Sequence, residues 1–184
     1  SMSHKPGANT VGAKAKIHVI AAFFMAALFA STAWAGEPAS KSAGDPEFLT
    51  FGAGMFDISA NDNSAVISIE YTDDRRWLWA LQPMTGIMAS IDGSVHAYAG
   101  VAVDLFFGRR YVLTPSFAPG LYLQGDGKDL GHVVEFRSSL KFAYRFDNRS
   151  RLGLDLFHLS NAGLDERNPG ANQLMLTYSV PFTR

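Results

Sequence analysis

The chain has 184 residues, no cysteine and a formal net charge of −1 at neutral pH. The absence of cysteine excludes a disulfide framework and thiolate chemistry. The weak charge and scattered arginines exclude the basic footprint of a nucleic-acid-binding protein. A chain of this length is expected to form one folded domain.

The N-terminal 35 residues have the pattern of a cleaved export signal. A basic region with Lys5, Lys14 and Lys16 precedes an apolar run at residues 17–30, and Ala33-Trp-Ala35 resembles a cleavage site. The apolar run is too short for a membrane-spanning helix. Residues 36–47 are polar and predict a flexible lead-in, so we expect the folded domain at residues 48–184.

Beyond the lead-in, polar and apolar residues alternate in eight segments that are separated by turn-forming residues. The predicted strands are Phe48–Ser59, Ser64–Thr72, Leu78–Ala89, Ser94–Phe107, Arg110–Leu123, His132–Phe146, Arg151–Ser160 and Asn172–Phe182. Most have roughly ten residues or more, which is the length of a tilted bilayer-crossing strand, whereas soluble proteins use strands of about five to six. We therefore predict an all-β fold, an eight-stranded antiparallel transmembrane β-barrel of the outer membrane.

The turns predict which end of this barrel faces outward. Asp73–Arg76, Gly108–Arg109 and Asp147–Ser150 are tight and charged, whereas the connections at 124–131 and 161–171 are long. Outer-membrane barrels have short periplasmic turns and longer external loops, and odd-numbered strands then run outward. The seventh strand is therefore expected to end at the external side.

Alternation also predicts the contents of the lumen. In the sixth strand Glu135, Arg137, Lys141 and Arg145 share one face, opposite a face of large apolar residues. An eight-stranded barrel is too narrow for a channel, so we expect these four residues to form an interior salt-bridge network.

Three prolines interrupt the strand pattern. Pro83, Pro115 and Pro119 fall inside predicted strands, and proline cannot donate a ladder hydrogen bond. We expect bulges or bends at these positions.

The seventh strand carries the candidate catalytic pair. Leu152, Leu154, Leu156, His158 and Ser160 alternate and so share one face. An imidazole two residues from a hydroxyl on one face is close enough to accept its proton. Both polar residues have the lipid-facing parity, where a polar side chain is costly and is by default a functional candidate.

Two features near this pair are consistent with catalysis. Asn172 begins the next strand on the same face and can orient the imidazole. The loop between the strands is rich in small and polar residues that can donate hydrogen bonds to an oxyanion. The His-x-Ser motif is short, however, and a histidine at the headgroup boundary beside a loop-capping serine is the alternative interpretation.

The C-terminal motifs resemble those of the lipid A 3-O-deacylase (PagL) family. They are Phe157-His-Leu-Ser-Asn-Ala-Gly163, Asn168-Pro-Gly-Ala-Asn172 and the closing segment 174–182, together with Gly131-x-x-x-Glu-Phe-Arg137. The resemblance is specific over about residues 131–182. It implies an integral outer-membrane enzyme without a cofactor, which removes the 3-O-linked hydroxyacyl chain from lipid A of lipopolysaccharide in the outer leaflet. Whether it acts as a homodimer stays open.

The resemblance also implies roles for individual residues. Ser160 matches the nucleophile and His158 the general base, and the family's oxyanion and loop-ordering residues fall at Asn161, Gly163 and Asn168. Family members carry a glutamate at the position of Asn172. An amide can orient an imidazole but cannot neutralise its cation, and the analogous change in a serine protease costs about 10⁴ in turnover, largely through the wrong tautomer.

Several alternatives remain on the sequence alone. Asp165 or Glu166 is a candidate surrogate acid, although both are also typical solvated loop acids. The chain could be a degenerate deacylase that binds lipid A without turnover, a non-enzymatic small barrel, or a phospholipase or other esterase with the same site. The histidines are scattered and predict no metal site, so His96 is expected to be structural and His132 a loop residue.

Overall fold

The computed structural model describes residues 46–59, 63–77 and 80–182. The predicted signal peptide and almost all of the predicted lead-in lie outside the described residues. Within the described residues, no helix has the length and apolar character needed to cross a bilayer.

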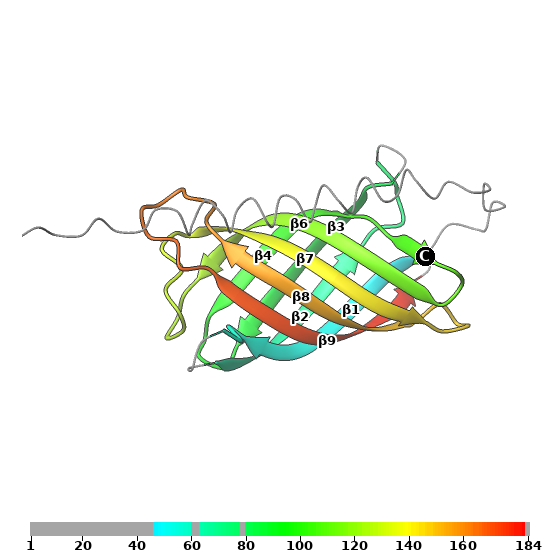
Figure 1. The fold of residues 1–184 in the computed structure, drawn as a ribbon, viewed down its shortest axis with the longest axis horizontal. Coiled ribbons are helices and arrows are strands. Elements are labelled where there is room, and N and C mark those ends of the chain that lie inside the picture. Colours follow the sequence, from blue (N-terminus) through cyan, green and yellow to red (C-terminus); the bar gives the residue numbers. More distant parts are fainter. Residues whose placement is uncertain (1–45, 60–62, 78–79, 183–184) are drawn as a thin grey trace, which may run out of the picture. The chain divides into compact units, whose positions relative to one another are not determined.

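The described residues form one antiparallel sheet that closes on itself. Its strands are β1 Glu47–Phe56, β2 Ser64–Thr72, β3 Gln82–Ser90, β4 Val95–Ala102, β5 Leu105–Phe107, β6 Tyr111–Leu123, β7 Val134–Arg145, β8 Arg151–Ser160 and β9 Ala171–Phe182. Apart from β4 and β5, strands that are neighbours in the chain pair with each other, β1 pairs with β9, and both β4 and β5 pair with β6 (Figure 1). β5 continues β4 along β6 in an unchanged register, so the two act as one barrel strand. The predicted eight-stranded antiparallel barrel is confirmed.

Most predicted strand limits lie close to the observed ones. β2 and β8 have the predicted limits, and β1 ends at Phe56 rather than at Ser59. β3 begins at Gln82 rather than at Leu78, because Trp77 and Leu81 form a tight turn in which each backbone N–H donates to the other carbonyl. The connection between β2 and β3 is therefore longer than the predicted turn at 73–76.

The bulges predicted at the prolines are wrong. The β6–β7 register is constant from Tyr111 opposite Tyr144 to Leu121 opposite Val134, across Pro115 and Pro119. The β3–β4 register is likewise constant across Pro83, which pairs with Val101, and the β2–β3 ladder ends at Met84. The visible effect is a gap in the β4–β6 pairing at Ala99 and Gly100, opposite Pro119 and Ala118. A missing donor thus interrupts the ladder without shifting it.

Ion pairs fill the middle of the lumen. Arg137 Nη2 donates to Asp155 Oδ2 over 2.6 Å, and Lys141 Nζ donates to Glu70 Oε1 over 2.8 Å. Tyr98 donates its hydroxyl proton to Glu70 Oε2 over 3.0 Å. The interior network predicted for Arg137 and Lys141 is therefore present.

Glu135 departs from that prediction. Its side chain is fully buried inside the barrel, but among the described residues neither carboxylate oxygen has a hydrogen-bond partner. The neighbouring His96 is also fully buried and stacks on Tyr98, with ring centroids 5.3 Å apart. His96 is thus an interior side chain, as expected for a structural residue.

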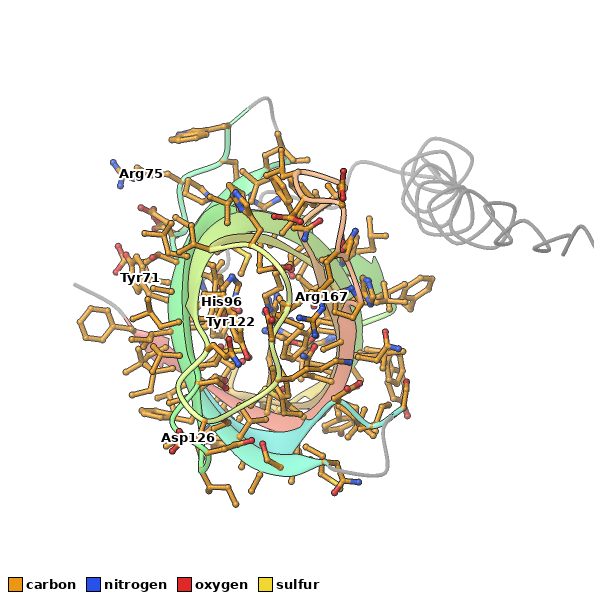
Figure 2. The ribbon with its side chains drawn as sticks, turned by 90° about the vertical axis from the view of Figure 1, so that its left-hand side faces the viewer. Tyr71, Arg75, His96, Tyr122, Asp126 and Arg167 are labelled. Atoms are coloured by element: carbon orange, nitrogen blue, oxygen red, sulfur yellow. The ribbon has the colours of Figure 1, made fainter. Side chains whose placement is uncertain are left out.

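The two ends of the barrel differ. At the loop end, where β8 finishes and β9 begins, the β6–β7 loop crosses the opening, and His96 and Tyr122 lie inside the ring of strands (Figure 2). Leu130 from this loop is buried with Phe157, Leu159 and Met175 in an apolar cluster. At the terminal end, where β1 begins and β9 finishes, a cavity of about 20 Å³ has room for about one water molecule. The lumen is packed with side chains rather than open.

Candidate active site

The outer wall of β8 changes from apolar to polar toward the loop end. Leu152, Leu154 and Leu156 are exposed, and His158 and Ser160 follow on the same face as half-buried residues. The inward face of β8 carries the buried Arg151, Gly153, Asp155, Phe157 and Leu159. The alternation holds because one face packs against the ion pairs and the apolar cluster of the lumen. His158 and Ser160 therefore point away from the lumen, as expected.

His158 is hydrogen-bonded across the β8–β9 pair. His158 and Asn172 are directly paired residues, and Nδ1 of the imidazole lies 2.8 Å from Oδ1 of the amide. Because a carbonyl oxygen only accepts, Nδ1 must carry the proton. Nε2 then presents a lone pair, which is the state that a general base needs.

Ser59 extends this chain of hydrogen bonds and was missed by the sequence analysis. Nδ2 of Asn172 donates to Ser59 Oγ over 2.9 Å, and the backbone N–H of Ile58 donates to the Asn172 carbonyl. Both residues follow β1, which pairs with β9. Ser59 lies 113 residues from Asn172 in the sequence, so no local motif could have indicated the contact.

Two serines flank the imidazole on the outer wall. Ser160 lies two residues along β8, and Ser138 of β7 is the residue paired directly with His158. Directly paired side chains have Cβ atoms about 5 Å apart. In the described part of the chain, neither hydroxyl is hydrogen-bonded to the imidazole. Catalytic hydrogen bonds are often long before substrate binds.

Gly170 packs against the reactive edge of the imidazole. It has a φ of 62°, and a Cβ at this position would lie 2.7 Å from Cε1 and 3.0 Å from Nε2 of His158. Both the backbone conformation and the space therefore require glycine here. The backbone just before β9 thus limits where the ring can move.

The β8–β9 loop is ordered by two asparagines. Asn161 is fully buried, donates from Nδ2 to the Leu130 and Arg167 carbonyls, and accepts from the Gly163 N–H at Oδ1. Its own N–H donates to Asn168 Oδ1 over 3.1 Å. Asn161 and Gly163 therefore hold the loop, and both donors of the Asn161 amide are used.

Asn168 differs from Asn161 in having a donor to spare. Its side chain is held beside the residue that follows Ser160, through Oδ1. Among the described residues, Nδ2 of Asn168 has no hydrogen-bond partner. The structure thus leaves one amide donor of Asn168 unused, on a side chain that is bonded to the residue after Ser160.

Asp165 and Glu166 are not brought to the imidazole. Both are exposed, and Asp165 Oδ1 accepts the N–H of Arg167 within its own loop. The Nδ1 position of His158 is occupied by Asn172. The geometry thus favours solvated loop acids over a surrogate acid.

A group of acidic residues with the spacing of metal ligands lies away from this site. In the described ranges, the group of three potential metal ligands is Glu47, Asp73 and Asp74, at the terminal end. The outer-wall site instead combines a hydroxyl, an oriented imidazole and an amide donor. This combination suits acyl transfer through a serine nucleophile.

Three comparisons with known proteins bear on this site. The sequence model of the lipid A 3-O-deacylase (PagL) family matches residues 64–181, from β2 to near the end of β9. A curated relative, the lipid A deacylase PagL of Bordetella bronchiseptica, is 26% identical over an alignment of 92 residues that covers 47% of this chain. The match covers 52% of that relative, so the chain spans about half the length of the curated protein.

A solved structure agrees on the fold. The crystal structure of the outer membrane enzyme PagL superimposes with a TM-score of 0.59 at 17% sequence identity. The superposition covers 73% of this chain and 99% of the other. At this identity the likeness concerns the fold alone.

Proposed function

Because this chain belongs to the lipid A 3-O-deacylase (PagL) family, we propose that it is an integral outer-membrane esterase that removes the 3-O-linked hydroxyacyl chain from lipid A. Its partners are then lipopolysaccharide and the outer leaflet of the bilayer. Homodimerisation stays an open alternative. The observation that carries the proposal is the hydrogen bond between His158 and Asn172, on the outer wall and beside Ser160.

The reaction follows from the roles of three residues. Ser160 Oγ attacks the ester carbonyl carbon while Nε2 of His158 accepts the hydroxyl proton. The carbonyl oxygen becomes an oxyanion that the Asn168 amide can stabilise. The bond to the sugar oxygen then breaks, and the imidazolium returns the proton to that oxygen. Water, activated by the same imidazole, releases the hydroxy fatty acid from Ser160.

The outer wall suits an amphiphilic substrate. Below His158 toward the terminal end, β8 exposes three leucines, and β9 exposes Leu174 and Leu176 opposite them. Acyl chains can pack on this apolar surface while the sugar stays near the loop end. The ester of lipid A lies at the boundary between sugar and hydrocarbon. His158 and Ser160 lie at the edge of the apolar surface, where they can reach such an ester.

Asn172 affects the rate rather than the type of reaction. The amide holds the imidazole in the Nδ1–H tautomer, which is the part of the acid's role that carries most of the loss in the serine-protease comparison. It provides no charge for the imidazolium in the transition state. We therefore expect a slower enzyme than one with a carboxylate at this position.

Ser160→Ala tests the nucleophile, with Ser138→Ala as its matched control. Both changes remove one outer-wall hydroxyl next to the same imidazole. We expect Ser160→Ala to lower lipid A deacylation at least 10³-fold, and Ser138→Ala to retain it. Mass spectrometry of lipid A after incubation with each refolded protein measures loss of the hydroxyacyl chain. Full activity of Ser160→Ala would contradict the proposal.

A degenerate deacylase is the second candidate, and the observation in its favour is the amide at Asn172 itself. In that case the wild-type protein binds lipid A in detergent but leaves its acyl chains intact. Turnover in Asn172→Glu, together with no turnover in the wild type, would identify this form.

A further inference from the structure

A cation in the β6–β7 loop connects three segments at the loop end. Nζ of Lys128 donates to Asp57 Oδ2 over 2.5 Å and to the Gly170 carbonyl over 2.8 Å. Asp57 follows β1, and Gly170 immediately precedes β9. One side chain thus joins the backbone beside the candidate base to the residue that follows β1, at the same end of the strand pair β1–β9.

Asp57 is held in an unfavourable conformation at this contact. Its φ is 54°, in the left-handed region that residues with a Cβ rarely adopt, and its side chain is 96% buried. Strained residues of this kind persist only where the surrounding structure holds them. Here the strain directs a buried carboxylate at Lys128, which neutralises it.

The backbone around Lys128 is held by contacts with the barrel. The Tyr122 hydroxyl donates to the Lys128 carbonyl over 2.8 Å, and the neighbouring Leu130 is buried in the apolar cluster of the lumen. The ammonium group is therefore fixed relative to the barrel rather than to a freely moving loop.

The other side of Gly170 faces the imidazole. Its carbonyl accepts from Lys128, while the space where a Cβ would stand on its α-carbon is taken by Cε1 and Nε2 of His158. A shift of the Gly170 backbone would therefore change the space available to the ring, on the edge that receives the proton from the nucleophile.

We propose that Lys128 is a positioning residue that, with Asp57, clamps Gly170 against His158 and so keeps Nε2 directed at Ser160. The effect of Lys128 on turnover rests on the proposed function. Its effect on the orientation of the His158 ring rests on the contacts alone. Lys128 acts through Gly170 and touches no reacting atom.

Arg167 provides a matched control. Its side chain joins the same two loops through an ion pair with Asp129, but it is exposed and contacts neither Gly170 nor His158 in the described structure. We expect Lys128→Met to lower kcat about 10- to 100-fold with KM changed less than about twofold, because small misplacements of a catalytic group have large effects on rate. Lys128→Arg should restore most of the rate, and Arg167→Met should leave it unchanged.

Imidazole ¹⁵N spectra in detergent micelles test the same idea without turnover. The His158 signals are assigned by their loss in His158→Gln. Wild type and Arg167→Met should show a single Nδ1–H tautomer, whereas Lys128→Met should show a mixture of tautomers. A Lys128→Met spectrum identical to that of wild type would overturn the proposal, as would equal losses of rate in both methionine variants. If wild type proves inactive, the proposed function fails, and the spectra alone decide the role of Lys128.

Discussion

Nδ1 of His158 and Oδ1 of Asn172 lie 2.8 Å apart on directly paired residues of β8 and β9. The amide therefore orients the imidazole as a carboxylate would, but it has no charge with which to stabilise the imidazolium.

Asn172→Asp should raise turnover about tenfold. The aspartate keeps the oxygen that accepts from Nδ1, so the tautomer is unchanged. A hydrogen bond to a charged acceptor is stronger than one to a neutral acceptor by about 1.4 kcal/mol, which corresponds to a factor of ten in rate. The rate constant of lipid A deacylation measures the gain. Asn172→Leu has neither the acceptor oxygen nor a charge, so its rate constant should fall well below that of wild type.

Ser59→Ala should lower turnover by a factor of about two to ten, the effect of one lost hydrogen bond. The hydroxyl accepts from Nδ2 of Asn172 and so holds the amide in its orientation. Ser59→Thr keeps the hydroxyl and should retain the rate. Equal rates for Ser59→Ala and wild type would mean that the β9 backbone alone orients the amide.

Gly170→Ala should abolish activity. The new methyl group would lie 2.7 Å from Cε1 of His158, and alanine also disfavours a φ of 62°. Gly93→Ala is the control, because Gly93 has a φ of 80° but no atoms within 4 Å of an added Cβ. The left-handed backbone alone should cost each variant about 1 to 2 kcal/mol of folding free energy. Only the change at Gly170 should stop lipid A deacylation.

Glu70→Gln and Glu135→Gln should have opposite effects on stability. Glu70 is paired with Lys141 and accepts from Tyr98, so its neutralisation leaves a buried cation and should cost about 3 kcal/mol. Glu135 is buried without a partner among the described residues, so its neutralisation should stabilise the barrel by about 1 kcal/mol. Urea unfolding in detergent micelles compares the two variants. A loss of stability in Glu135→Gln would mean that the carboxylate has a stabilising partner.

Alternation made the barrel and the outward face of its site predictable. Arg151–Ser160 could be delimited from the sequence because its inward residues meet a packed lumen and its outward residues do not. The same reasoning put Ser160, His158 and Asn172 on one wall. The bulges predicted at the prolines are absent because a missing N–H need not shift the register of a ladder.

The supporting residues could not be found in this way. Ser59, Asp57 and Lys128 reach the site from β1 and from the β6–β7 loop, and their contacts depend on how distant strands are registered. Parity placed Ser138 outward, but only the length of the β7–β8 turn sets it opposite His158. Likewise, alternation placed Glu135 inside without indicating that it would lack a partner.

The ladder gap opposite Pro119 lies in the β4–β6 pair, and the other strand pairs of the described residues have no such internal gap. In denaturant the β4–β6 hydrogen bonds should break first, and the barrel should become an open sheet. The wall of β7, β8 and β9 that carries the candidate site, with β1 beside it, has continuous ladders and should survive this rupture. Among the barrel strands, amide exchange should therefore be fastest near Ala99, on β4, which contributes no residue to the candidate site.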